Sequence, residues 1–220
     1  MSSAYLALRE RIAAAAARAG RPVRLVAVSK TKPAAAVRAL AGSGQRAFGE
    51  NYVQEALGKQ RELAGLDLEW HLIGPLQSNK CREVAAHFQW LQSLDREKLV
   101  APLDRHRAAD AAPLNVLIQV NVDAETSKSG CPPEAVPRLA ERIAAAPRLA
   151  LRGLMAIPAP AEPERRRAAF RRMAALYNAL KSTFPHVDTL SMGMSDDFEL
   201  AIEEGATMVR IGTALFGARG

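Results

Sequence analysis

Short apolar runs alternate along this chain with longer segments of helical pattern. Each run is rich in β-branched or other apolar residues and is followed by a polar turn and then by apolar positions at helical spacing. The eight runs cover residues 25–29, 46–49, 69–73, 90–94, 114–122, 151–157, 189–192 and 207–211. The pattern between them predicts helices, among them 81–88 and 134–145, and a further helix over 4–19 precedes the first run.

Strands that alternate with helices pair in parallel through right-handed crossovers, and eight such repeats close a barrel. The sequence therefore predicts a single-domain (β/α)8 TIM barrel over residues 1–220, with an additional N-terminal helix. An open doubly wound sheet is the alternative. Its dinucleotide-binding form requires G-x-G-x-x-G after an early strand, whereas the first turn, residues 29–33, reads SKTKP.

Composition favours a soluble cytoplasmic protein. Charged residues interrupt the alanine-rich opening segment, so it does not resemble a signal peptide, and no stretch approaches the ~20 apolar residues of a membrane helix. Cys81 and Cys131 form no C-x-x-C pair, which predicts two free thiols and no metal site. We expect a monomer.

A net charge of +7 raises the question of nucleic-acid binding. The densest cationic cluster comprises Arg165, Arg166, Arg167, Arg171 and Arg172. Acidic residues at 162 and 164 precede it, which favours a solvated helix face over a polyanion site. Nucleic acid is therefore not an expected partner, and polyanion binding is kept as an alternative.

In barrels of this kind the functional site forms at the carboxyl ends of the strands. Lys30 directly follows the first run and shares a face with Val26 and Val28, so it is expected to point inward. An apolar barrel mouth favours the neutral amine, which is the form that condenses with an aldehyde. The alternative is a lysine that extends to solvent and pairs with a loop carboxylate. Lys32, next to Pro33, is a weaker candidate.

The loops after the seventh and eighth strands commonly bind phosphate. Gly212 allows the backbone to approach an anion closely, and Thr213 and Ser195 add hydroxyl donors. Ser195 could instead cap its own helix, and the neighbouring carboxylates of Asp196 and Asp197 would repel an anion unless they turn away.

Arg210 lies on the same strand face as Gly212 and needs an acceptor if it is buried. A pyridine nitrogen would serve, and a permanently protonated arginine would leave that nitrogen unprotonated. A salt bridge to a neighbouring strand is the alternative.

Six motifs, in this order, resemble the pyridoxal-phosphate homeostasis protein family, the single-domain relatives of the alanine racemase N-terminal barrel. They are AVSKTKP (27–33), FGENYVQE (48–55), WHLIGPLQSNK (70–80), GLMAI (153–157), GMSDD (193–197) and RIGT (210–213). The resemblance covers nearly the whole chain, without a departure at the site positions.

The resemblance implies that the chain binds pyridoxal 5′-phosphate (PLP) as a Schiff base on Lys30. It also implies that Arg210 faces the pyridine nitrogen, that Ser195, Gly212 and Thr213 hold the phosphate, and that Asn51 lies beside the ring. The implied function is a carrier and buffer of PLP in cofactor homeostasis, with PLP-dependent apoenzymes as possible recipients.

Catalytic turnover is not expected, although a weak amino-acid racemase or lyase is the alternative. Two-sided proton transfer needs two bases, and racemases of this barrel type add a second domain that supplies a tyrosine, whereas this chain stops just after the eighth strand. Tyr52 is the tyrosine nearest a strand end, and we expect it to pack beneath a loop. His71 is expected to be a packed histidine of the third strand. Lys128, in a polar loop, is a minor candidate for a second amine that receives the aldehyde in transit.

Overall fold

The computed structural model describes residues 3–125, 129–159 and 161–217 as a closed barrel of parallel strands. Its strands, in the order in which they pair around the barrel, are β1 (Arg24–Val28), β2 (Ala47–Glu50), β3 (Glu69–Leu72), β4 (Trp90–Leu94), β5 (Leu114–Gln119), β6 (Leu149–Met155), β7 (Thr189–Ser191) and β8 (Met208–Ile211). β1 pairs with both β2 and β8, with Val26 opposite Arg210, so the sheet has no free edge.

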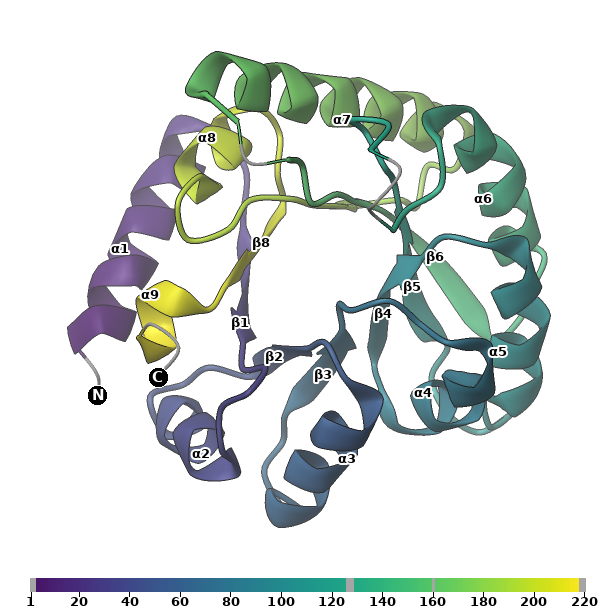
Figure 1. The fold of residues 1–220 in the computed structure, drawn as a ribbon, viewed down its shortest axis with the longest axis horizontal. Helices are drawn as coiled ribbons and strands as arrows, with labels where there is room; N and C mark the ends of the chain where they lie inside the picture. Colours follow the sequence, from purple (N-terminus) through teal and green to yellow (C-terminus); the bar gives the residue numbers. More distant parts are fainter. Residues whose placement is uncertain (1–2, 126–128, 160, 218–220) are drawn as a thin grey trace.

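The helices form a ring around the barrel when it is viewed along its axis (Figure 1). They are α1 (Ser3–Arg18), α2 (Ala34–Gly42), α3 (Val53–Glu62), α4 (Cys81–His87), α5 (Val100–His106), α6 (Val136–Ala144), α7 (Pro163–Thr183), α8 (Phe198–Glu203) and α9 (Thr213–Phe216). Short 3-10 turns precede three of them, at Ser78–Lys80, Glu97–Leu99 and Pro133–Ala135. α1 precedes the first strand and packs against α8 and α9.

Alternation of side chains along each strand produces two separate cores. One face of the strands fills the barrel interior with Val26, Ala47, Trp90, Leu117, Met155 and Met208. The other face packs against the helices and belongs to a larger cluster that includes Phe48, Leu72, Leu91, Val116, Leu154 and Phe170. The interior is therefore filled by side chains, as in other barrels of this class, and a ligand site is left for the ends of the strands.

The eight predicted strands and the N-terminal helix are confirmed, and the closed barrel excludes the open-sheet alternative. Most strand ends agree with the prediction to within one residue, and two strands differ by more. β5 ends at Gln119 rather than at 122, because Val120 pairs with Cys131 and the chain then turns around the Asn121 side chain. β6 begins at Leu149 and ends at Met155 rather than spanning 151–157.

Three further findings, on cysteines, membrane-spanning helices and metal sites, apply to the described residues. Cys81 and Cys131 are buried and free, as predicted. Among the described residues no helix is long and apolar enough to cross a membrane. In the same part of the chain no group of three or more histidine, cysteine or acidic side chains is arranged to hold a metal ion.

Candidate functional site

Lys30 is half-buried in the turn that follows β1, at the carboxyl end of the barrel. The backbone holds this turn on both sides. The Ser29 N–H donates to Gly49 O on β2 at 3.0 Å, and the Lys32 N–H donates to Ser29 O at 3.0 Å. Thr31 adopts a positive φ of 63°, a left-handed conformation that is strained for a β-branched residue. Contacts around the turn must therefore maintain it.

Lys59, a residue of α3, provides several of these contacts. Its Nζ donates to Ser29 O, to Glu50 Oε1 and to Glu55 Oε1, each at 2.6 Å. Glu55 Oε1 also accepts the Thr31 N–H at 2.6 Å. The residues on both sides of Lys30 are thus tied to one buried ammonium group and its carboxylate partner.

Glu50 lies at the end of β2 and is fully buried between the sheet and α3. Burial raises the pKa of this carboxyl above its ordinary value, although the hydrogen bonds from Lys59 and Ser29 act in the opposite direction. We name Ser29, Glu50, Glu55 and Lys59 the turn cluster. Sequence reasoning missed Lys59 because a lysine on an amphipathic helix is ordinarily solvated.

The carboxyl end of β8 lies directly beside that of β1. A Cβ on Gly212 would be 3.1 Å from Val28 O and 3.3 Å from Val28 Cβ, so a larger residue would push the two strand ends apart. On the other flank Val28 is opposite Gly49 of β2. β1, which leads to Lys30, therefore lies between β2, which leads to Asn51, and β8, which leads to Gly212.

Arg210 is buried on β8, with 3% of its surface exposed. Its Nη1 donates to Ser191 Oγ at 2.6 Å and its Nη2 donates to Ala156 O at 2.8 Å. Burial lowers the pKa of the guanidinium to about 10, and the charge of Asp197 acts in the opposite direction. The salt-bridge alternative is wrong for the described residues, because both acceptors are neutral oxygens, one on β7 and one directly after β6.

The loops after β7 and β8 meet at Ser195. Its Oγ accepts the N–H of Ala214, in the first turn of α9, at 3.5 Å. Gly212 and Thr213 are therefore brought to the same place as Ser195, and Thr213 is exposed there. The suggestion that Ser195 caps its own helix is wrong, because Asp197 occupies the N-cap position of α8.

Asp197, whose charge complicates an anion site, is directed elsewhere. Its Oδ1 accepts the Met194 N–H at 2.6 Å, and its Oδ2 lies 3.6 Å from Arg166 on α7. The carboxylate is thus engaged with its own loop and with α7. The positive charge of Arg166 thus partly offsets one of the two carboxylates that would repel an anion here.

Asn51 is half-buried directly after β2. A Cβ on Gly74 would lie 2.2 Å from Asn51 O, so only glycine allows the loop after β3 to pack against Asn51. The expectation for its neighbour Tyr52 is wrong. Tyr52 is 61% exposed rather than packed beneath a loop, because α3 begins at the next residue and leaves the ring outside the barrel.

His71 is buried inside the barrel, as predicted, and both of its ring nitrogens have partners. Nε2 lies 2.7 Å from Glu69 Oε1 and Nδ1 lies 2.9 Å from Gln92 Nε2. The ring also stacks on Trp90, with the two centroids 5.3 Å apart. Burial lowers the pKa of His71 below its ordinary value, with Glu69 acting in the opposite direction, which keeps the imidazole neutral.

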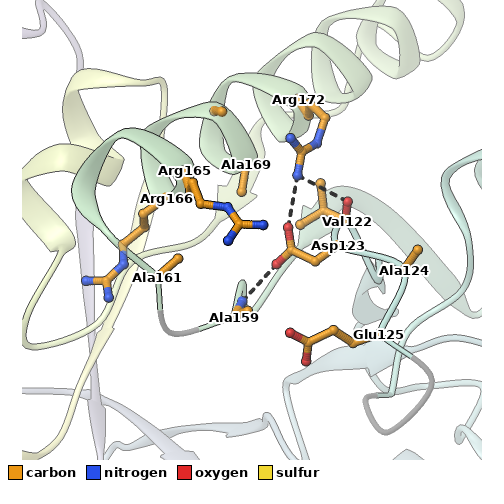
Figure 2. Close-up of a pocket in the computed structure, with 11 residues that line it drawn as sticks. Val122, Asp123, Ala124, Glu125, Ala159, Ala161, Arg165, Arg166, Ala169 and Arg172 are labelled. Atoms are coloured by element: carbon orange, nitrogen blue, oxygen red, sulfur yellow. Dashed lines mark hydrogen bonds and ion pairs between the residues drawn. The ribbon is translucent and has the colours of Figure 1, made fainter.

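A cavity of about 570 Å³ lies between the loops after β5 and β6 and the first half of α7. In Figure 2 the guanidinium groups of Arg165 and Arg172 point toward Asp123, and that of Arg166 points away. Arg172 donates to Asp123 Oδ1 at 2.9 Å, and the Ala159 N–H donates to Oδ2 at 2.8 Å. Lys128 lies outside the described residues.

The other arginines of the α7 cluster also have acidic partners. Arg167 pairs with Glu203 and Glu204, and Arg171 pairs with Glu204 at 3.0 Å. Carboxylates of neighbouring elements thus neutralise much of the positive charge that the sequence places on this helix. The structure favours a solvated, paired helix face here over a polyanion site.

Comparison with known proteins assigns the chain to a family. The alanine racemase N-terminal domain family matches residues 5–220. The pyridoxal phosphate homeostasis protein of Pseudomonas aeruginosa is 61% identical over 213 residues, which are 95% of this chain and 91% of that protein. This chain belongs to the pyridoxal phosphate homeostasis protein family.

Two further comparisons agree with this assignment. The family member of Escherichia coli (strain K12) is 54% identical over 219 residues, which are 96% of this chain and 94% of that protein. The structure of PipY from Synechococcus elongatus PCC7942 with PLP bound is similar, with a TM-score of 0.81 and 40% identity, covering 94% of this chain and 99% of that chain. The family and the barrel predicted from the sequence are therefore confirmed.

Proposed function

We propose that this protein is a cytoplasmic carrier of PLP that takes part in cofactor homeostasis and holds PLP as a Schiff base on Lys30. Bound PLP supplies an aldehyde, and the Lys30 amine condenses with it with loss of one water. Arg210 faces the pyridine nitrogen, and Asn51 lies beside the ring. Ser195, Gly212 and Thr213 bind the phosphate.

One observation carries the proposal. The strand register places the turn of Lys30 between the ends of β2 and β8, and the Gly212 backbone lies against Val28 at the end of the lysine strand. Ser195 then joins the same corner through the Ala214 N–H. An amine and a group of hydroxyl and backbone N–H donors therefore occupy neighbouring strand ends of one barrel mouth.

The donor chemistry of these residues fits PLP. Hydroxyl groups and a glycine backbone suit a phosphate, and Asp197 is turned toward α7. Arg210 is a buried cation whose described acceptors are neutral, so it can donate to one more acceptor without displacing a carboxylate. Because arginine does not release its proton, the ring nitrogen opposite it stays unprotonated, which weakens PLP as an electron sink.

The positions of His71 and of the tyrosines among the described residues favour a carrier over a racemase or lyase. His71 has both nitrogens engaged inside the barrel, and Tyr5 and Tyr177 are buried near the amino-terminal ends of the strands. Among the described residues Tyr52 is the phenol that lies next to a carboxyl strand end, and it is exposed. Stereocontrolled proton transfer to both faces needs two positioned groups.

Incubation of the PLP-loaded protein with both enantiomers of several amino acids tests this choice. The carrier function predicts turnover no faster than that of free PLP, together with activation of a PLP-dependent apoenzyme by the loaded protein. Turnover well above that of free PLP, and abolished by Lys30→Ala, would establish the racemase or lyase instead. Recipient apoenzymes are expected partners in this proposal.

A further inference from the structure

A line of polar side chains crosses the barrel interior. It comprises Glu69 and His71 of β3, Gln92 of β4, Ser191 of β7 and Arg210 of β8. The last four are at most 3% exposed. Burying so many polar groups is costly unless each is hydrogen-bonded, so their arrangement requires an explanation.

Hydrogen bonds join these side chains without a gap. Arg210 Nη1 donates to Ser191 Oγ at 2.6 Å, and Ser191 Oγ donates to Gln92 Oε1 at 2.7 Å. Gln92 Nε2 lies 2.9 Å from His71 Nδ1, and His71 Nε2 lies 2.7 Å from Glu69 Oε1. We name these five residues the interior chain.

The two ends of the interior chain determine the direction of every link. A guanidinium only donates and an ionised carboxylate only accepts. Because Ser191 accepts from Arg210, its own hydrogen is directed to Gln92, and the Gln92 amide must then donate to His71. The imidazole is consequently neutral with its hydrogen on Nε2, facing Glu69.

Glu69 is a suitable acceptor at the far end. Burial alone would raise the pKa of this carboxyl, but the hydrogen bond from His71 and the charge of Arg24 outweigh it and lower the pKa below its ordinary value. Arg24 also donates to Glu69 Oε1 at 2.7 Å. The chain therefore runs between a fixed anion at the amino-terminal side of β3 and the guanidinium near the barrel mouth.

Gln92 is the residue on which this direction depends. Its amide accepts from Ser191 with one atom and donates to His71 with the other, which no apolar side chain could do. We propose that Gln92 is a positioning residue that holds the Arg210 guanidinium in one orientation toward the PLP ring. Because Gln92 accepts the hydrogen bond of the Ser191 hydroxyl, the Ser191 oxygen is left to accept from Arg210. This inference rests on the proposed function.

The experiment compares the visible absorbance band and the PLP dissociation constant of wild type, Gln92→Leu and Ser191→Ala. Gln45→Leu is the matched control, because Gln45 is also buried and hydrogen-bonded, to Leu25 O and Ala47 O, but lies outside the interior chain. Both chain variants are expected to move the band or its pH midpoint and to weaken PLP binding roughly tenfold, the loss expected for one hydrogen bond to a charged group. Gln45→Leu retains the wild-type band.

Wild-type spectra and affinities in folded Ser191→Ala and Gln92→Leu would overturn the inference while leaving the proposed function intact. If Gln92→Leu does not fold, Ser191→Ala decides, since it removes one hydroxyl from the same link. A shift of equal size in Gln45→Leu would also overturn the inference, because loss of any buried amide would then suffice. Absence of a band in wild type would instead remove the proposed function, and the inference with it.

Discussion

Replacing Lys59 by methionine is the sharpest perturbation of the turn cluster. Methionine has a similar length and no charge, so it removes the donor of three hydrogen bonds while retaining most of the packing of the stem. Glu50, which is fully buried, then keeps only the Ser29 hydroxyl as a described donor. The substitution leaves a buried carboxylate without its counter-charge.

The burial of the pair determines the magnitude. The side chains of Lys59 and Glu50 are 6% and 0% exposed, so solvent screens their interaction little. Removing one partner from a buried pair costs about 3–5 kcal/mol, because the other charge stays buried. We expect Lys59→Met to lower the free energy of unfolding by this amount near neutral pH.

The loss should depend on pH in a defined direction. Burial already raises the pKa of Glu50 above 4.5 in the folded state, and loss of Lys59 raises it further. A carboxyl with a raised pKa binds its proton more tightly when folded, so the folded state loses stability as pH rises through this range. The deficit of Lys59→Met is therefore expected to be smaller near about pH 5 than near about pH 8.

Urea denaturation of the protein without added PLP, monitored by circular dichroism at several pH values, measures the free energy of unfolding and its dependence on pH. Lys80→Met is the matched control, because Lys80 pairs with Glu83 at 3.4 Å and the two side chains are 30% and 29% exposed. That pair should contribute less than about 0.5 kcal/mol. A loss in Lys59→Met as small as in the control, or a deficit that shrinks as pH rises, would refute the reasoning.

Two further predictions concern the barrel itself. Gly153→Ala should lower the melting temperature far more than Gly65→Ala. Both glycines have a positive φ, 145° and 92°, but only at position 153 would the new Cβ lie 1.8 Å from Thr189 O. Equal shifts of the melting temperature would contradict this prediction. In the native protein Cys81 and Cys131 should resist a thiol reagent, because burial raises the pKa of both thiols, that of Cys131 to about 12. Denaturant should expose both thiols to the reagent. Rapid labelling of the native protein would contradict the burial of these cysteines.

Periodicity predicted the barrel well because each strand and helix must bury a defined face. The strand runs and the motif residues at their ends came directly from that alternation. Strand ends were predicted less well: the apolar run through Val120 and Val122 continues past Gln119. The Val120 N–H still donates to Met155 O of β6, but the Asn121 N–H that follows donates to Cys131 O. Such a change of partner depends on contacts between distant residues.

The contacts behind the site were not predictable in the same way. Lys59 and Gln92 are far in sequence from Lys30 and Arg210, and each looks ordinary on its own element. The available signal for Gln92 was its position in β4, where it shares the inward face with Trp90 and is nonetheless polar. The partners that make these residues important come from other strands and helices, which local patterns do not identify.

The most direct test of the central claim is mass spectrometry of the PLP-loaded protein after reduction with borohydride and proteolysis. The account predicts a pyridoxyl phosphate adduct on Lys30, which is lost in Lys30→Ala and retained in Lys32→Ala. No adduct, or an adduct on another lysine while Lys30 stays unmodified, would contradict it.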